Sequence, residues 1–545
     1  MKKKLTTTIL FLLSAFIPRL YAQDSLEIHK LEQAIGIISS NYMDTISMHR
    51  LIEETIKAMF ERLDPHSIYR SKNEAKDDFL NQPHQYIGSG MDFRMFDDTM
   101  TITDVIKNSP ADKSGIIKGD KISFLNGKNV SGSRLKYPEI RDYLIKLYNS
   151  NDSIKLGVVR DKKTRVLKFA PSELPHKSIE SAYAVNDSCI FVKINYFTFN
   201  TGQEFLNTLL KFNKKQRKNI ILDLRDNPGG ILTSCNQVCT HFFNEGIQIV
   251  NLRGQTYESG KSLFTEAGGL LTESRVCVII NENSASSSEV IAGALQDWDR
   301  GIVVGRRSFG KGLVQQLFTL SDGSQIRITV SKLYTPCGRY IQKAYKMGEF
   351  NKYAGEILSR SLRGENTDEK KIPLQETGGI YHSIRLNRKL HAGLGIIPDV
   401  FVSEDTVNMP QFWQSWFSCG MIDNFILEDI NRNRKYYEKK YSDYNKFVTN
   451  FIPDRVLERK IFFYSQTDTS ARTKISEKEF HRYCGQYTEI SGQENAVLRQ
   501  LKAHYALYLF GKDEYRKFLN IQDRDFLAAL ELINNYNAYQ NVFNK

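Results

Sequence analysis

The residues with the clearest chemical potential are a serine and a lysine in two short segments rich in small residues. Ser286 lies in residues 281–289 (Asn-Glu-Asn-Ser-Ala-Ser-Ser-Ser-Glu), and Lys311 lies in residues 308–312 (Ser-Phe-Gly-Lys-Gly). A neutral lysine amine can remove the proton of a serine hydroxyl, which becomes a nucleophile without any histidine. Such a lysine must be buried or close to another positive charge, because either condition lowers its pKa. If the fold brings the two residues together, the pair predicts a serine hydrolase whose base is an amine.

The setting of Ser286 is compatible with catalysis and with simple helix capping. The serine follows an apolar strand predicted for residues 276–280 and precedes a helix predicted for residues 287–298. Glu289 has the spacing of a capping box, so capping alone is the alternative interpretation. Catalysis would use the same geometry, because a helix N-terminus presents unpaired N–H groups and a positive dipole end. The N–H of Ser287 is therefore a candidate donor to an oxyanion.

The segment around Lys311 also has two interpretations. Its flanking glycines allow close backbone approach, and the side chain of Gln315 could hydrogen-bond the amine, although a solvated lysine is the alternative. Residues 305–311 match the phosphate-binding pattern G-x-x-x-x-G-K. However, Gly312 stands where a Ser or Thr should hold magnesium, and the next residues alternate like a strand instead of opening a helix. These features disfavour nucleotide binding.

A third segment, residues 223–230 (Asp-Leu-Arg-Asp-Asn-Pro-Gly-Gly), ends an apolar strand. Proline followed by two glycines predicts a tight turn, and the N–H groups of Gly229 and Gly230 could provide the second half of an oxyanion site. An ordinary strand-to-helix turn is the alternative. Arg225 and Asp226 could likewise form a structural ion pair rather than take part in catalysis.

The elements that must position these segments are predicted from the pattern of apolar and polar residues along the chain. Residues 188–335 alternate apolar strands with helical stretches, which predicts a largely parallel, buried sheet with crossover helices. Residues 313–330 read as a hairpin around Asp322 and Gly323. Residues 25–62 are predicted to be helical, and residues 83–172 are predicted to form short strands joined by Gly-containing turns. Beyond residue 403 the chain is helical, aromatic and charged, with no chemical motif.

Composition narrows the choice of partners and cofactors. A chain of 545 residues is long enough for several domains. The net charge of +13 comes from 75 basic and 62 acidic residues that are spread along the chain without a nucleic-acid-binding motif, so no nucleic acid partner is expected. Cys235 and Cys239 are four residues apart but lack further ligands, so they are expected to be buried structural thiols. No metal or organic cofactor is implied.

Residues 1–22 have the layout of a secretory signal. Three lysines at positions 2–4 precede an apolar run over residues 5–17, and Ala22 is a suitable last residue before cleavage. The run is shorter than the roughly 20 residues of a membrane span. We expect the protein to be exported to the periplasm or cell envelope, with no membrane span after removal of the signal.

Taken in order along the chain, the motifs resemble those of a known family. They occupy residues 63–69 (Leu-Asp-Pro-His-Ser-Ile-Tyr), 223–230, 281–289, 308–312 with Gln315, 335–339 (Thr-Pro-Cys-Gly-Arg) and 395–400 (Gly-Ile-Ile-Pro-Asp-Val). Over residues 25–402 the chain resembles the carboxyl-terminal processing peptidases, or tail-specific proteases, which are PDZ-containing Ser/Lys proteases of peptidase family S41. It departs from the family pattern at Ser287, where alanine is usual, and at Cys337 and Leu394.

The resemblance implies an α/β fold with a crotonase/ClpP-like βαβ protease core and an inserted PDZ domain. The implied parts are the signal peptide 1–22, an N-terminal helical segment 23–82, the PDZ domain 83–172, the protease core 173–402 and a helical C-terminal extension 403–545 of unassigned role. It also implies the site: Ser286 as nucleophile, Lys311 as general base, Gln315 as its support, and oxyanion donors from Gly229, Gly230 and Ser287.

The PDZ resemblance adds a peptide-binding site. Successive N–H groups of Ile87, Gly88, Ser89 and Gly90 could capture a terminal carboxylate while a strand edge pairs with an extended peptide. A module that only gates the active site is the alternative. We therefore expect an exported endopeptidase that binds protein C-termini and cleaves through an acyl-enzyme. The rival is a catalytically inactive PDZ scaffold, and homo-oligomer formation is left open.

Overall fold

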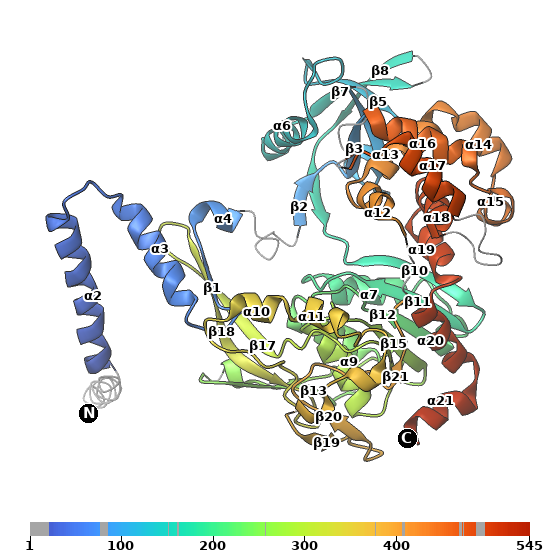
Figure 1. The fold of residues 1–545 in the computed structure, drawn as a ribbon. Coiled ribbons are helices and arrows are strands. Elements are labelled where there is room, and N and C mark those ends of the chain that lie inside the picture. The colour runs from blue at the N-terminus through green and yellow to red at the C-terminus, as the bar shows by residue number, and fades with distance from the viewer. Residues whose placement is uncertain are drawn as a thin grey trace, which may run out of the picture. The chain divides into compact units, whose positions relative to one another are not determined.

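The structure is a computed structural model, drawn as a ribbon in Figure 1. Its chain divides into two compact units. The N-terminal unit consists of Met1–Lys76, Leu317–Ile328 and Lys346–Phe350, and the main unit contains the remaining residues. The structure describes residues 21–76, 85–96, 98–150, 152–160, 163–256, 258–376, 378–405, 409–467, 471, 473–486 and 496–544. The predicted signal segment, 1–22, lies outside these residues except for its last two positions.

In its described residues, the N-terminal unit contains helices, a short strand and the hairpin residues Leu317–Ile328. Its helices are α2 (Tyr21–Asn41), α3 (Met48–Phe60) and α4 (Lys72–Lys76), and its strand β1 (Ile68–Arg70) pairs antiparallel with the first residues of β18 (Gln325–Tyr334). The helical region predicted for 25–62 is thus two helices. Ser47 caps α3 by accepting a hydrogen bond from the N–H of Arg50. In the motif at 63–69, Asp64 accepts from the N–H of His66 and the hydroxyl of Ser67, which forms a turn.

The first part of the main unit contains the short strands predicted for residues 83–172. One sheet has the order β3-β4-β5-β7-β8, with β6 paired to β5. Its strands are β3 (Met91–Phe96), β4 (Thr99–Val105), β5 (Lys121–Leu125), β6 (Lys128–Asn129), β7 (Ile154–Arg160) and β8 (Lys163–Phe169), and β2 (Gln85–Gly88) pairs separately with β9 (Ser172–Pro175). Helix α6 (Tyr137–Asn149) buries Ile140 and Leu144 against this sheet. Strand β3 lies at an edge of the sheet.

The second sheet confirms the predicted parallel core. Its order is β10-β11-β12-β15-β16-β21, and all neighbours from β11 onward are parallel, whereas β10 is antiparallel. Its strands are β10 (Ile179–Asn186), β11 (Cys189–Ile194), β12 (Asn219–Asp223), β15 (Arg275–Ile280), β16 (Ile302–Gly305) and β21 (Val400–Phe401). Helices α7 (Thr201–Leu209), α8 (Leu232–Thr240) and α9 (Ser287–Asp297) pack apolar side chains on one face. Both sides of the central strands are buried, as a run of apolar residues requires.

The other face of this sheet is covered by the end of the chain. Helix α20 (Arg524–Asn534) lies beside β12 and β15 in Figure 1, and α21 (Tyr536–Phe543) reaches β15 through a hydrogen bond from Tyr539 to Val276. Phe526, Ile533 and Tyr539 pack there with sheet residues such as Phe191 and Ile279. The C-terminal extension therefore completes the core of the protease sheet, which the sequence did not predict.

The rest of the extension is helical, as predicted, and has an aromatic core of its own that includes Trp416, Phe447 and Tyr505. Its helices are α12 (Gln411–Ser418), α13 (Met421–Arg432), α14 (Arg434–Lys440), α15 (Tyr444–Asn450), α16 (Arg455–Thr467), α17 (Glu477–Gln486), α18 (Ala496–Leu509) and α19 (Lys512–Asn520). This part contacts β3, because Arg94 donates a 2.9 Å hydrogen bond to the Asn424 side chain.

The remaining elements are α5 in the 83–172 module and several elements of the protease core. They are α5 (Pro110–Lys113), α10 (Phe350–Ala354), α11 (Glu356–Leu362), β13 (Gln248–Gly254), β14 (Leu263–Phe264), β17 (Leu313–Thr319), β19 (Ile380–His382) and β20 (Lys389–His391). Strand β17 pairs with β18, which confirms the hairpin predicted for 313–330.

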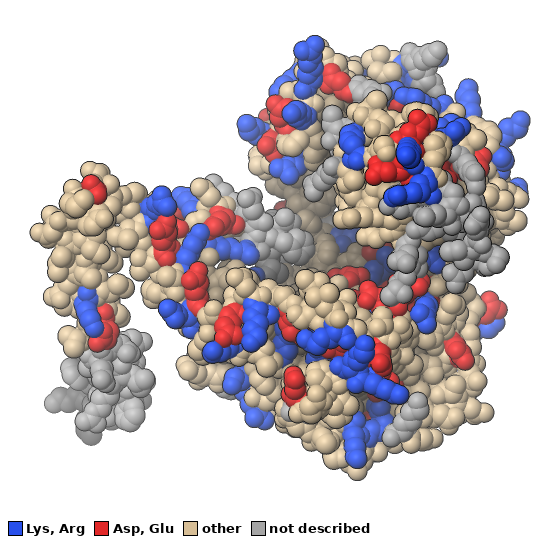
Figure 2. Space-filling view, viewed as in Figure 1, with Lys and Arg blue, Asp and Glu red and all other residues tan. Residues whose placement is uncertain are grey.

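Charged side chains of both signs are interspersed on the face shown in Figure 2, so the basic residues do not gather into one patch there. Among the described residues, no helix is long and apolar enough to cross a membrane. Within the same ranges, no group of His, Cys, Asp and Glu side chains has an arrangement suited to a metal ion.

Candidate active site

Ser286 occupies a strained position between strand β15 and helix α9. Its backbone φ of 55° and ψ of −114° lie in a region that residues with a side chain rarely adopt. An ordinary helix N-cap has extended backbone instead, so capping alone does not account for this conformation. Strain of this kind persists only where the surroundings enforce it, and it is common at functional sites.

Glu289 enforces that conformation and joins Ser286 to the lysine segment. Its carboxylate is fully buried and accepts four hydrogen bonds. Oε2 accepts from the N–H of Ser286 and from the N–H of Lys311, both at 2.8 Å. Oε1 accepts from the hydroxyl of Ser308 at 2.5 Å and from the N–H of Gly310 at 2.7 Å. One carboxylate oxygen thus brings together the backbones of the predicted nucleophile and the predicted base.

The sequence interpretation recognised Glu289 only as part of a capping box. Burial raises the pKa of this carboxyl, and the four hydrogen bonds oppose that effect by favouring the charged form. An acidic residue in an otherwise apolar helix segment is the signal that could have revealed it, because a buried carboxylate needs several donors.

The turn at 227–230 lies directly against the Ser286 segment. The carbonyl of Asn227 accepts from the N–H of Ala285 and from the hydroxyl of Ser288, both at 3.0 Å. The hydroxyl of Ser287 donates to the carbonyl of Gly230 at 2.9 Å. At Gly229, where φ is 96°, an added Cβ would lie 2.7 Å from the Cβ of Ser286. The close approach of the two segments therefore requires glycine at position 229.

The hydrogen bonds of this turn revise the predicted oxyanion donors. The N–H of Gly229 already donates to Oδ1 of Asn227 at 2.9 Å, so it is engaged within the turn. The N–H groups of Gly230 and Ser287 donate to no acceptor in the described part of the chain. Of the three predicted donors, Gly230 and Ser287 have available N–H groups, whereas Gly229 provides space.

The segment that carries Lys311 runs from β16 into β17. The N–H of Phe309 donates to the carbonyl of Ser284 at 2.9 Å, which attaches this segment to the one that carries the nucleophile. Lys311 itself is half-buried. Because the segment continues as a strand and not as a helix, the structure contradicts the phosphate-loop alternative. Gln315 donates through Nε2 to the carbonyl of Leu313 at 3.0 Å and to the hydroxyl of Thr329 at 3.1 Å.

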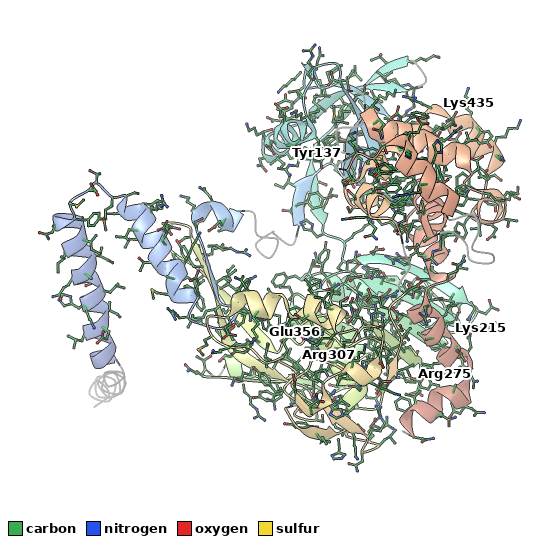
Figure 3. The ribbon with its side chains drawn as sticks, viewed as in Figure 1. Tyr137, Lys215, Arg275, Arg307, Glu356 and Lys435 are labelled. Carbon is green, nitrogen blue, oxygen red and sulfur yellow. The ribbon has the colours of Figure 1, made fainter. Side chains whose placement is uncertain are left out.

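Two side chains of α11 hold the same segment from the other side. The buried Arg360 donates to the carbonyls of Ser308 at 2.7 Å and Phe309 at 3.0 Å, and through Nε to Glu356 at 2.8 Å. Arg307 also pairs with Glu356, at 3.2 Å, and the two side chains lie next to each other in Figure 3. Burial alone would raise the pKa of Glu356, but Arg360 and the neighbouring cations outweigh it and lower the pKa to about 2.

The alternative of an ion pair between Arg225 and Asp226 is wrong. Arg225 donates instead to the buried carboxylate of Asp223 at 2.7 Å, and Asp226 accepts from the amides of Asn281 and Asn283, both at 2.9 Å. Burial raises the pKa of Asp223, but the charges of Arg225 and Lys193 outweigh it, so the pKa falls below its usual range. These contacts join the turn after β12 to the segment after β15.

Cys235 and Cys239 are buried thiols on α8, as predicted. The Cys235 thiol lies 3.2 Å from the carbonyl of Ser287 and packs beneath the helix that follows the nucleophile. Burial raises the pKa of the Cys235 thiol well above its ordinary value, which suits a structural residue.

In the module at residues 83–172, the predicted carboxylate-binding turn has two parts: one pairs with a strand, and the other offers N–H donors. Ile87 and Gly88 belong to β2, which pairs with β9. The N–H groups of Ser89 and Gly90 lie beyond that ladder and meet no acceptor among the described residues. The hydroxyl of Ser89 hydrogen-bonds that of Tyr148 on α6 at 2.8 Å, and burial raises the pKa of Tyr148 to about 12. The turn therefore offers two N–H donors beside the edge strand β3.

Comparison with known proteins agrees with this architecture. Residues 189–347 match the model of peptidase family S41, and residues 89–169 match a PDZ domain. Residues 19–74 match the family described as the activating protease CtpB N-terminal domain.

Individual relatives cover most of the chain. A probable CtpA-like serine protease of Staphylococcus haemolyticus is 31% identical over 67% of this chain and 79% of its own length. The carboxy-terminal processing protease CtpB of Bacillus subtilis is 31% identical over 76% of this chain and 85% of its own length. The solved photosystem II D1 C-terminal processing protease aligns with 18% identity over 70% of this chain and 87% of that chain, at a TM-score of 0.35.

The parallel sheet, the module at residues 83–172 and the segments that meet at Ser286 define a PDZ-containing serine protease with a mixed α/β core. The chain belongs to peptidase family S41, the carboxy-terminal processing proteases. The fold class and the enzyme class expected from the sequence are thereby confirmed.

Proposed function

We propose that this protease is an exported endopeptidase that binds protein C-termini and cleaves peptide bonds with Ser286 as nucleophile and Lys311 as general base. The observation that carries the proposal is the carboxylate of Glu289, whose Oε2 accepts from the backbone N–H of both residues. Preorganised geometry of this kind is what nucleophilic catalysis needs, because a displacement of about 1 Å can cost about a hundredfold in rate.

In the proposed reaction the hydroxyl oxygen of Ser286 attacks the peptide carbonyl carbon while the neutral amine of Lys311 takes its proton. The oxyanion that forms accepts hydrogen bonds from the N–H groups of Gly230 and Ser287. The C–N bond then breaks, and Lys311 returns the proton to the leaving amine. Water, deprotonated by the same lysine, hydrolyses the acyl-enzyme and releases Ser286.

Gln315 is assigned a supporting role. Its amide nitrogen is occupied by Leu313 and Thr329, so its carbonyl oxygen is the atom available to accept from the amine of Lys311. Such an acceptor would orient the amine toward Ser286.

The PDZ domain is proposed to bind the substrate C-terminus. The N–H groups of Ser89 and Gly90 are suited to a carboxylate, and the edge strand β3 is suited to pairing with an extended peptide. Export to the cell envelope is proposed on the signal-like composition of residues 1–22.

The proposal is tested with purified protein and an unfolded protein substrate. Ser286→Ala and Lys311→Met should each lower kcat by at least about a thousandfold. Lys215→Met removes an exposed lysine from the same unit and should leave kcat unchanged. Cleavage by Ser286→Ala at the normal rate would contradict the assignment, and an inactive wild-type protein would favour the scaffold alternative.

The recognition step needs its own measurement. Ser286→Ala protein should bind a fluorescent peptide with a free C-terminus at least about tenfold more tightly than the same peptide with an amidated C-terminus, because a neutral amide lacks the charge that the turn recognises. Equal affinity for the two peptides would contradict carboxylate recognition.

A further inference from the structure

A carboxylate from the C-terminal extension lies between two arginines of the protease core. Asp525 is in the first turn of α20 and is 5% exposed. The cap of this helix is already provided by Asp523, whose side chain accepts from the N–H of Phe526. Asp525 is therefore not needed as a cap, and its burial calls for other partners.

Both partners are arginines. Nη1 of Arg225 donates to Oδ2 of Asp525 at 3.0 Å and to both carboxylate oxygens of Asp523 at 2.8 and 2.9 Å. Nη1 of Arg306 donates to both carboxylate oxygens of Asp525 at 3.2 Å. Asp525 therefore bridges two guanidinium groups that follow separate strands of the core, β12 and β16.

Each arginine lies at the start of a segment that enters the candidate site. Arg225 follows β12 and precedes the turn that ends at Gly230. Arg306 follows β16 and precedes the segment that carries Lys311. Nε of Arg306 also donates to Glu282 at 3.1 Å, and Glu282 belongs to the segment that ends at Ser286. The carboxylate thus contacts two of the segments that form the site and is linked to the third through Arg306 and Glu282.

The helix that supplies this carboxylate is firmly placed. Phe526, the residue after Asp525, packs against the sheet, and Ala529 and Ile533 do the same one and two turns further along α20. The side-chain hydroxyl of Tyr539 on α21 donates to the carbonyl of Val276 at 3.1 Å and accepts from the N–H of the same residue at 3.2 Å. A carboxylate on so rigid a support can fix the separation of the two arginines.

We infer that Asp525 is a positioning residue for catalysis: by bridging Arg225 and Arg306, it holds the oxyanion turn and the lysine segment at their working separation. The inference rests on the proposed roles of Gly230, Ser286 and Lys311. It assigns a function to a part of the chain in which no chemical motif occurs.

The test compares Asp525→Asn with Ile533→Val, which removes one methyl group from the same helix without touching either arginine. We expect Asp525→Asn to lower kcat at least tenfold with KM changed less than twofold, and to slow labelling of Ser286 by a fluorophosphonate by a similar factor. Ile533→Val should keep both rates within twofold of the wild type. A merely structural role would move the thermal midpoint of both variants and leave kcat per folded molecule unchanged, and that result would overturn the inference.

A second variant keeps the inference falsifiable if Asp525→Asn does not fold. Arg306→Gln leaves Asp525 paired with Arg225 and should also lower kcat at least tenfold, and a folded Arg306→Gln protein with wild-type kcat would overturn the inference. Where both single variants fold, the double variant should be no slower than the slower single one, because both break the same bridge.

Failure of the proposed function is recognised separately. Ser286→Ala assayed in parallel abolishes cleavage and labelling if the nucleophile is correct, whatever Asp525 does.

Discussion

At the scale of single residues, the geometry of the site depends on a small number of atoms that link its segments. The oxygen Oε2 of Glu289 receives the N–H groups of both Ser286 and Lys311, and a single glycine allows the turn at 227–230 to approach the nucleophile. Neither residue needs to contact a substrate. Each acts on the reaction by fixing where the reacting groups stand.

The first prediction at this scale concerns Gly229. Gly229→Ala should lower kcat by more than about a hundredfold, because the new Cβ would lie 2.7 Å from the Cβ of Ser286 and displace it. Gly246→Ala is a matched control: its φ of 78° is equally left-handed, but an added Cβ meets nothing within 4 Å. Both variants should lose about 1–2 kcal/mol of unfolding free energy to backbone strain. Equal kcat values in the two variants would contradict the steric argument.

Glu289→Gln should reduce both activity and stability. A glutamine amide presents two hydrogens toward donors that need an acceptor, so at least one of the four hydrogen bonds is lost in a buried site. We expect a loss of about 2–4 kcal/mol in unfolding free energy, measured by urea titration. In the folded fraction, kcat should fall by at least tenfold. The exposed Glu245→Gln serves as control and should change neither quantity.

The rate should also depend on pH in the way an amine base requires. The neutral form of Lys311 is the active one, so kcat/KM should rise as pH increases through the pKa of the base. A profile that is flat between about pH 6 and about pH 10 would exclude Lys311 from this role.

At the scale of elements, α11 holds the lysine segment through Arg360 and through Glu356, which pairs with Arg307 of that segment. The carbonyls of Ser308 and Phe309 are fixed by one buried guanidinium, and Glu356 balances the charges of both arginines. The helix therefore stabilises a stretch of chain that is neither helix nor strand.

Acid should release this support within a defined range of pH. Because the pKa of Glu356 is lowered to about 2 from an ordinary value of 4.5, its contribution is complete above pH 4.5 and is lost as the pH falls toward 2. Glu356→Gln should therefore be less stable than the wild type at pH 7, by about 1–2 kcal/mol, and the difference should shrink across that range. Denaturant titrations at several pH values measure this. The exposed Glu376→Gln, outside α11, should give no such dependence, and a pH-independent difference for Glu356→Gln would contradict the assignment.

At the scale of the whole molecule, the end of the chain is part of the protease core. Helices α20 and α21 cover a face of the parallel sheet that would otherwise expose side chains such as Phe191 and Ile279. The stability of the catalytic sheet and the presence of the C-terminal extension should therefore be inseparable.

Tyr539→Phe tests this dependence with the loss of one oxygen atom. The variant leaves both the N–H and the carbonyl of Val276 without their side-chain partner, which should cost about 1–3 kcal/mol of unfolding free energy. Tyr536→Phe changes an exposed tyrosine of the same helix and should have no measurable effect. If thermal unfolding showed equal midpoints for the two variants, the extension would not be stabilising the sheet in this way.

The sequence alone determined the chemistry and the local structure of this protein. Apolar runs fixed the strands β11, β12 and β15, and the residues at 223–230, 281–289 and 308–312 identified the segments with catalytic potential, because these features depend on neighbours along the chain. Tertiary structure decided which groups are available. It engaged the N–H of Gly229, paired Arg225 with Asp223 and not with Asp226, gave Glu289 its four donors, and placed Asp525 between two arginines. These contacts join residues that are distant in sequence, and no local pattern encodes the register in which distant segments pack.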